Sequence, residues 1–462
     1  MWGYIGTNKN SDYREELTKH ISHEINCKEF ISRVKDGCER VFSRQRKLDI
    51  RKLIVFIMSF KSALQRDLDR FYKAMSNSDF NIREVTKSAL SQSRSKLNPW
   101  AFVRLNEISV DFFYKKASYY TWHGMRTLAV DGTRLQLPNH PTVKEEFGEY
   151  MFGPKASTPR SMAMGSMLYD VLNHITLDAE IAPYASSERD LLVQHLKKVE
   201  KGDLLLLDRG YPCFWLFFLL KAKGVEFCIR LENEWWKEVE SLMASPEQER
   251  IVKFRLPKKD HGKLSEYPEI ISQEIDCRLI KVKLETGETE ILCTSLTDLK
   301  KYDIEEFKRL YHYRWNEEEC YKLLKSRLDL ESFSGKTAKA VRQDFHAKVF
   351  LLTLCAAYCH PIEAKVLAEY EEEQKEQEQK EEEQKEEKGK KKRKYQQKPN
   401  KTNALANLMD MLIPIFLKRK YRKAVKAFDD IVSRTKEVVR PDRKVDRPKK
   451  IKKPHSMNYK KL

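Results

Sequence analysis

The first 120 residues carry apolar positions at helical spacing. Two stretches, 48–75 and 85–108, repeat such positions every three or four residues, and the turn-prone SNSDFN at 76–81 separates them. Residues 1–120 are therefore predicted to form a helical N-terminal domain. Within it, four polar residues fall on or near one side of the helix expected at 85–97: Lys87, Ser91, Arg94 and Ser95. This pattern is typical of a helix that reads the major groove of DNA, and slightly more so of an ordinary amphipathic helix.

Beyond residue 120 the pattern changes to short apolar runs that are typical of buried strands. RTLAV leads into Asp131 and DLLLL leads into Asp208, and a glycine follows each aspartate within two residues. Each predicted strand therefore ends at its aspartate. Side chains just past the carboxyl ends of strands in an open α/β sheet line the crevice where ligands bind, so the two aspartates predict a shared site. Taken singly, each is more typical of a plain turn or a helix cap.

The rest of the core alternates between strands and helices. Apolar runs at 161–184 indicate antiparallel partners, and helices are expected at about 187–200 and over FWLFFLLKAK. This alternation predicts an α/β fold. Residues 230–300 read instead as strands, with a hairpin turn at Thr286 and Gly287, and predict a β-rich insertion in the core.

A polar stripe follows the insertion. Its members lie at helix-compatible steps of three, four and seven residues: Tyr311, Arg314, Glu318 and Lys325. A second, apolar stripe that includes Leu310 and Leu324 runs beside it, so one side of the helix packs and its neighbour presents charge. An exposed helix with surface ion pairs would show the same stripe, and for this segment alone the two interpretations are equally good.

Asp131, Asp208 and Glu318 together form a candidate catalytic site. Three carboxylates without a Cys or His cluster are typical ligands of Mg²⁺ or Mn²⁺. Two such ions, held about 3.5–4 Å apart by bridging carboxylates, activate an attacking water or 3′-hydroxyl and stabilise the leaving oxygen in phosphoryl transfer. A glycosidase pair explains neither the cations beside Glu318 nor the charge of the chain.

Composition indicates a polyanionic partner. The chain has 462 residues, 88 Lys and Arg against 69 Asp and Glu, and a net charge of +19. This favours nucleic acid, although ribosome-associated and membrane-surface proteins share such a charge. The nine cysteines form no Cys-x2-Cys pair, no apolar signal core is present, and no apolar run approaches 18 residues, so we expect a cytoplasmic protein with reduced thiols and no membrane association.

These motifs resemble those of bacterial insertion-sequence transposases of the DDE class. The signature Tyr-x2-Arg-x3-Glu-x6-Lys, written out from Tyr311 to Lys325, is similar to that of the YREK group, the insertion-sequence-four family. Further similar segments are VDGTRL, LLLDRGYPCFW, ESFSGKTAKAVRQDFHAK and FSRQRKLDIRKLIVFIMSFKSALQRDLDRF. The resemblance runs from about residue 30 to 360.

The resemblance implies a DNA transposase with an RNase H-like catalytic core, in parts 121–229 and 301–362, interrupted by the insertion at 230–300. It implies metal-dependent cleavage at the ends of the insertion sequence and strand transfer into target DNA. Asp131, Asp208 and Glu318 would be the metal ligands. Tyr311, Arg314 and Lys325 would contact the transposon-end DNA, and a homodimer would act on paired ends. Two alternatives are an inactive DNA-binding relative and a nuclease that cuts without joining.

Other segments of the sequence carry less specific patterns. Trp235 or Trp236 would stack on a flipped base if the ends form hairpins, but adjacent tryptophans are more often packing residues. SGKT at 334–337 lacks the leading glycine of a P-loop, so no nucleotide cofactor is expected. Residues 363–401 have almost no apolar side chains and predict a charged linker, and 402–462 predict C-terminal helices with a basic tail.

Overall fold

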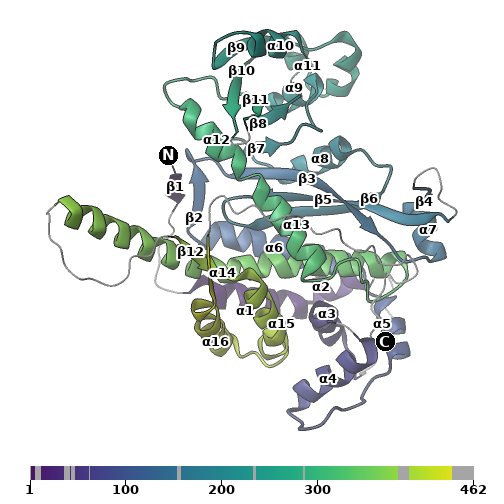
Figure 1. The fold of residues 1–462 in the computed structure, drawn as a ribbon. Coiled ribbons are helices and arrows are strands. Elements are labelled where there is room, and N and C mark those ends of the chain that lie inside the picture. Colours follow the sequence, from purple (N-terminus) through teal and green to yellow (C-terminus); the bar gives the residue numbers. More distant parts are fainter. Residues whose placement is uncertain are drawn as a thin grey trace. The chain divides into compact units, whose positions relative to one another are not determined.

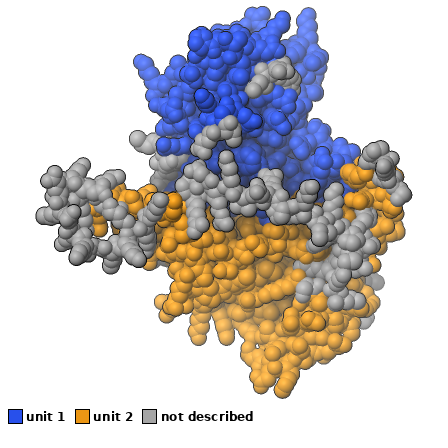
Figure 2. Space-filling view, in the orientation of Figure 1, with its two compact units in different colours: residues 1–7, 118–135, 162–322 blue, residues 8–117, 136–161, 323–462 orange. Residues whose placement is uncertain are grey.

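The structure is a computed structural model. It describes residues 2–5, 12–35, 42, 47–61, 63–152, 158–232, 236–284, 287–382 and 395–439. The chain divides into two compact units, coloured blue and orange in Figure 2. Unit 1 comprises Met1–Thr7, Ser118–Leu135 and Met162–Lys322, and unit 2 comprises Asn8–Ala117, Gln136–Ser161 and Leu323–Leu462. Each unit therefore draws on three separate segments of the chain.

Unit 1 is built on a mixed β-sheet (Figure 1). The sheet has the strand order β5-β3-β7-β8-β11-β10-β9, and β6 pairs with β5. Its strands are β3 (Thr127–Gln136), β5 (Arg160–Asp170), β6 (Ile175–Pro183), β7 (Leu204–Leu207), β8 (Glu226–Leu231), β9 (Glu249–Arg255), β10 (Glu274–Lys283) and β11 (Thr289–Thr294). A separate two-stranded sheet pairs β1 (Trp2–Ile5) with β2 (Tyr119–Trp122). The helical segments are α8 (Glu188–His195), Leu196–Lys198, α9 (Phe214–Ala222), α10 (Lys237–Ala244), Lys258–Leu264, α11 (Pro268–Ile271), α12 (Ile304–His312) and α13 (Trp315–Ser326), the last of which continues into unit 2.

The centre of this sheet follows from its sequence. All four leucines of β7 are buried, as expected of a strand that is covered on both faces. β7 pairs in parallel with β3 on one edge and with β8 on the other. From β8 outward the pairing is antiparallel through β11, β10 and β9. The strands predicted within residues 230–300 therefore lie at one end of the same sheet, and β10 and β11 form the predicted hairpin, whose Gly287 has a φ of +88°.

Two local predictions are wrong. β3 does not end at Asp131 but continues to Gln136, because the alternate residue Leu135 is also buried and extends the strand pattern. The polar stripe does not lie on one helix either. α12 ends at His312 and α13 begins at Trp315. Between them the N–H groups of Tyr313 and Arg314 bond to carbonyls three residues back, a tighter turn that a spacing of three also fits.

Unit 2 is largely helical. Its helices are α1 (Tyr13–Asn26), α2 (Lys28–Val34), α3 (Ile50–Ser59), α4 (Leu64–Ser76), α5 (Lys87–Arg94), α6 (Trp100–Lys116), α7 (Pro141–Phe147), α14 (Ala338–Glu382), α15 (Lys401–Leu412), a π-helical turn at Ile413–Leu417 and α16 (Tyr421–Arg434). Its short strands are β4 (Glu149–Tyr150), β12 (Gln397–Pro399) and β13 (Lys436–Val438). The long helix α14 packs against α6, α3, α15 and α16, and so forms the centre of this unit.

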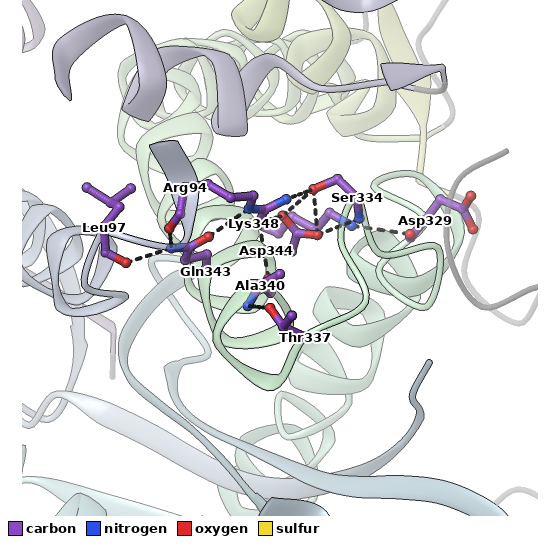
Figure 3. A network of polar contacts seen from close by, with 9 residues as sticks. All are labelled: Arg94, Leu97, Asp329, Ser334, Thr337, Ala340, Gln343, Asp344 and Lys348. Carbon is purple, nitrogen blue, oxygen red and sulfur yellow. Dashed lines mark hydrogen bonds and ion pairs between the residues drawn. The ribbon is translucent and has the colours of Figure 1, made fainter. Parts of the chain in front are cut away.

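A buried polar network joins α5 to α14 within unit 2 (Figure 3). The guanidinium of Arg94 donates to Asp344 at 2.9 Å and to Ser334 Oγ at 2.6 Å. Its Nε donates to Gln343 at 2.8 Å. Arg94 is therefore a structural residue, and it does not lie on an exposed DNA-reading face of α5.

One stretch of α14 has an unexpected composition. Within Ala338–Glu376 it is long and apolar enough to cross a membrane, although the sequence had indicated no such run. Of that apolar window 72% is buried inside the structure, as in the core helix of a water-soluble protein. α14 also continues to Glu382, so the first part of the predicted linker is helical.

Candidate active site

Asp131 and Asp208 meet across two parallel strands. β3 and β7 pair in register from Thr127 with Leu204 to Ala129 with Leu206. The same register, continued for two residues, sets Asp131 beside Asp208, the first residue after β7. The charges of the two carboxylates act on one another. The structure thus brings together the two aspartates that the sequence singled out.

Helix α13 is fastened to β3 at Asp131. Glu317 Oε1 accepts a hydrogen bond from the Asp131 N–H at 2.9 Å, and the Tyr321 hydroxyl donates to the Asp131 carbonyl at 2.7 Å. Glu317 and Tyr321 are four residues apart, so they share one face of the helix. Because both sides of the Asp131 backbone are held, the first aspartate is fixed relative to α13 and its neighbouring Glu318.

Arg314 links the third carboxylate to the first. Its Nη2 donates to Glu318 Oε1 at 3.0 Å, and its Nη1 lies 4.0 Å from Asp131 Oδ2. The side chain is buried, so this cation acts in surroundings where charge is weakly screened. The guanidinium therefore partly balances both carboxylates.

The other two members of the signature have different surroundings. Tyr311 is buried, and its hydroxyl donates to the Leu207 carbonyl at 3.3 Å, which ties α12 to the end of β7. Lys325 lies half-buried on the last turn of α13, in unit 2, whereas Glu318 lies on the same helix in unit 1. The structure thus gives Tyr311 a bond within the protein, and the contact of either residue with DNA stays a prediction.

The carboxylates at this site are poorly compensated. Burial raises the pKa of Asp131 to about 6, opposed by the Gly132 N–H and Arg314 and assisted by nearby carboxylates. Burial and the charge of Asp131 raise the pKa of Glu317 well above its usual range. Glu188 behaves in the same way, because burial and then Asp208 raise its pKa. At these three groups burial and the neighbouring carboxylates outweigh the opposing effect of Arg314, Arg134 and Arg189.

Divalent metal ions fit this donor set by chemistry and charge. Within the described ranges, no group of three His, Cys, Asp or Glu side chains is arranged to hold a metal ion. The candidate ligands are nevertheless all carboxylates, which Mg²⁺ and Mn²⁺ prefer. Glu317 Oε2 is buried without a hydrogen-bond partner, and so is the Tyr211 hydroxyl. The charges of Glu188, Asp131 and Asp208 act on Tyr211. A cation and its bound waters would supply the missing charge and partners.

Sequence reasoning missed several of these residues. Glu317 adjoins Glu318, Tyr321 follows Glu318 by three residues on the same helix, and Tyr211 follows Asp208 by three residues, so a sequence signal existed for each of them. Glu188 adjoins none of the three candidate ligands in the sequence, and only the fold brings it there. Trp236 packs within the protein, because its ring stacks on Phe214 with centroids 4.7 Å apart and meets Phe254 edge-on. Trp235 lies outside the described residues.

The site sets carboxylates from two neighbouring parallel strands and from a helix bonded to one of them in one region of a mixed β-sheet. A family described as "Transposase DDE domain" matches residues 122–354, just over half of the chain. The chain belongs to this family, and the resemblance to DDE transposases of insertion sequences is confirmed. It is a DNA transposase.

Individual relatives agree with this assignment. "Transposase InsG for insertion sequence element IS4" of Escherichia coli (strain K12) is 26% identical over 321 residues, which is 66% of this chain and 69% of InsG. "Putative transposase InsZ" of the same strain is 25% identical over 185 residues, 38% of this chain and 59% of InsZ. A cryo-EM structure of the piggyBac transposase synaptic complex with hairpin DNA covers 89% of this chain and 85% of that one. At a TM-score of 0.45 and 10% identity, that likeness is too low to establish a shared fold.

Proposed function

We propose that this transposase cuts DNA at the ends of an insertion sequence and joins those ends to target DNA, with Asp131, Asp208 and Glu318 as metal ligands. The observation that carries the proposal is the fastening of α13 to the backbone of Asp131, which itself lies beside Asp208. Residues far apart in the sequence thereby supply carboxylates to one region of unit 1.

The strand order supports an RNase H-like core. Across the sheet, the antiparallel pair of β6 and β5 lies beside three strands in the order β3-β7-β8. Of these three, β7 is parallel to both of its neighbours. The outer strands β9, β10 and β11 support the proposal that residues 230–300 are an insertion in this core. We keep 1–120 as the helical N-terminal domain that binds DNA.

The residues of the candidate site have distinct proposed tasks. Bound Mg²⁺ or Mn²⁺ would activate the attacking oxygen and stabilise the leaving one. Asp131, Asp208 and Glu318 would hold the ions, and Tyr321 and Glu317 would fix the Asp131 backbone. Arg314 would keep Glu318 oriented and would be positioned to grip a phosphate of the end DNA, with Lys325 as a second point charge.

The remaining parts of the proposal concern partners and place of action. The net charge of +19 favours binding to DNA, and paired ends would be processed by a homodimer. We infer a cytoplasmic protein that uses no nucleotide cofactor. The family match favours neither of the alternatives, an inactive DNA-binding relative or a nuclease without joining activity.

Incubation of the purified protein with paired-end DNA, Mg²⁺ and a supercoiled target tests the function. Joined product supports the proposal, whereas cleavage alone identifies a nuclease and a bound but uncut complex identifies an inactive relative. The ends are taken from the short inverted repeats that flank the coding region.

Substitutions then test the residues. Asp131→Asn, Asp208→Asn and Glu318→Gln should each lower cleavage about 1,000-fold, since metal-assisted charge stabilisation is worth about 4 kcal/mol, and should leave end binding largely intact. Glu319→Gln is the matched control, because Glu319 is the exposed next residue of α13 and pairs with Lys322. Undiminished cutting by any of the three variants would remove that residue from the site.

A further inference from the structure

Glu188 lies against the two glycines that follow the candidate aspartates. A methyl group on Gly132 would lie 2.6 Å from Glu188 Oε1, which is closer than real contacts allow. A methyl group on Gly210 would lie 3.1 Å from Asp208 Oδ1 and 3.7 Å from Glu188 Oε2. Both glycines thus border the Glu188 carboxylate.

Space, rather than backbone conformation, explains Gly132, whereas a methyl group on Gly210 would meet Glu188 only at an ordinary contact distance. Neither Gly132 nor Gly210 is among the residues with a positive φ, so another residue could adopt either backbone without strain. A larger side chain at Gly132 would take the space that the Glu188 carboxylate occupies. The glycine of the Asp-Gly motif at Asp131 therefore leaves room for the Glu188 carboxylate, in addition to the turn that the sequence suggests.

Helix α8 is held in the position that aims Glu188 at this site. Arg189, the next residue, donates to the carbonyls of Gly210 at 2.9 Å and Tyr211 at 3.1 Å. The loop after Asp208 is thereby bonded to the first turn of α8. An acidic residue in the first turn of a helix often serves only to balance the helix dipole, and it is then exposed. Glu188 is instead half-buried, and the like charge of Asp208 acts on it more strongly than either Arg134 or Arg189.

Buried groups without partners point into the same region. Among the described residues, the Tyr211 hydroxyl and Glu317 Oε2 are buried with no hydrogen-bond partner. The surroundings of Tyr211 include the carboxylates of Glu188, Asp131 and Asp208. Like charges gathered beside unpaired polar atoms are costly unless a further species, cationic and able to bring bound water, lies among them.

We propose that Glu188 is a fourth carboxylate of the metal site, where it acts beside Asp208 on the same divalent cation or on a water bound to it. This inference rests on the proposed function, because it takes Asp208 to be a metal ligand. It adds a residue that the three-carboxylate signature does not contain.

Metal binding by the full-length protein tests the proposal without DNA or turnover. Mn²⁺ is titrated into wild type, Glu188→Gln, Asp208→Asn and Asp190→Asn, and the free ion is followed by electron paramagnetic resonance. Asp190 is the matched control, an exposed carboxylate in the same first turn of α8. Glu188→Gln should weaken Mn²⁺ binding about 10- to 100-fold, as loss of a supporting ligand does, and Asp190→Asn should not.

The two variants distinguish a failure of the inference about Glu188 from a failure of the proposed function. If Asp208→Asn loses Mn²⁺ and Glu188→Gln binds it as wild type does, the inference is wrong and the proposed function stands. If both bind Mn²⁺ like wild type, the proposed site itself is wrong. Thermal melting without metal excludes a folding defect: Glu188→Gln should melt at or above the wild-type temperature, because like-charge repulsion is relieved, and should gain less from added Mn²⁺.

A steric pair tests the contact itself. Gly132→Ala should weaken Mn²⁺ binding with little change in the melting temperature of the metal-free protein, because the new methyl group displaces the end of the flexible Glu188 side chain. In a Glu188→Gln background, which already lacks the carboxylate, the same substitution should have no further effect on Mn²⁺ binding. Wild-type Mn²⁺ binding by Gly132→Ala, or additive effects of the two substitutions, would show that the two residues do not meet as described.

Discussion

Loss of the Arg94 guanidinium should be among the most destabilising single changes in unit 2. The side chains of Arg94 and Asp344 are only 7% and 4% exposed, and their ion pair spans 2.9 Å (Figure 3). In Arg94→Met, Asp344 keeps its hydrogen bonds from Ser334 but loses its closest cation. Gln343 Oε1 and the Ala340 carbonyl lose donors as well. Breaking a buried pair on one side costs about 3–5 kcal/mol of unfolding free energy.

A surface pair provides the comparison. Lys61 and Asp410 also join distant parts of unit 2, at 2.5 Å, but their side chains are 49% and 66% exposed. Lys61→Met should therefore cost less than about 1 kcal/mol. Urea unfolding measures both variants, and hydrogen exchange of peptides from α5 and the first turns of α14 shows whether the loss is local to the network.

The decisive variant removes the second charge. Arg94→Met with Asp344→Asn should be more stable than Arg94→Met alone, because the side-chain amide keeps an acceptor for the Ser334 N–H and removes a buried carboxylate charge that has lost Arg94 and keeps only Lys348. Equal or lower stability of the double variant would refute the explanation by uncompensated charge.

The same pair predicts how the stability depends on pH. Burial would raise the pKa of Asp344, but Arg94, Lys348 and the Ser334 hydrogen bonds hold it below its usual value. Its contribution is therefore present above the unfolded-state pKa of about 3.9 and is lost as the pH falls through the lower folded-state value. In Arg94→Met the deficit should shrink on acidification, since protonation removes the unpaired charge.

Three further predictions concern the site and its DNA. Tyr321→Phe should cost about 1–3 kcal/mol in urea unfolding and slow cleavage, because the buried Asp131 carbonyl loses its donor. Unchanged cleavage would show that this bond does not position Asp131. Lys325→Ala should weaken end-DNA binding and leave Mn²⁺ affinity unchanged; loss of metal with retained DNA would contradict its role. Changing Arg422, Lys423 and Lys426, which are exposed on α16 without ion pairs among the described residues, to Gln should weaken nonspecific duplex binding and reduce its salt slope by about one per contact. An unaltered slope would exclude α16 from DNA contact.

The sequence predicted those features that depend on local pattern. Four consecutive leucines predicted the strand before Asp208, and the alternation of apolar and polar residues predicted the hairpin at Gly287. The continuation of β3 past Asp131 was missed, because a following glycine marks a turn as readily as a close approach. The break between α12 and α13 was missed, because three residues fit both an α-helix and a tighter turn.

Glu188 could not be found from sequence for a different reason. Its position in a helix start after β6 is ordinary, and its significance arises only where α8 meets the residues after two other strands. Arg94 shows the converse, since its spacing suited a groove-reading face and only the distant Asp344 on α14 explains why it is buried.

Helix α13 carries both Glu318 and Lys325, seven residues apart. Seven residues of α-helix span about 10.5 Å, and a duplex advances about 3.4 Å for each base pair. The distance between the two residues along the helix axis therefore corresponds to about three base pairs of a duplex. If Glu318 holds a metal ion at the bond to be cut and Lys325 grips a phosphate, as proposed, the number of residues between them on α13 sets the spacing of these two points along the DNA.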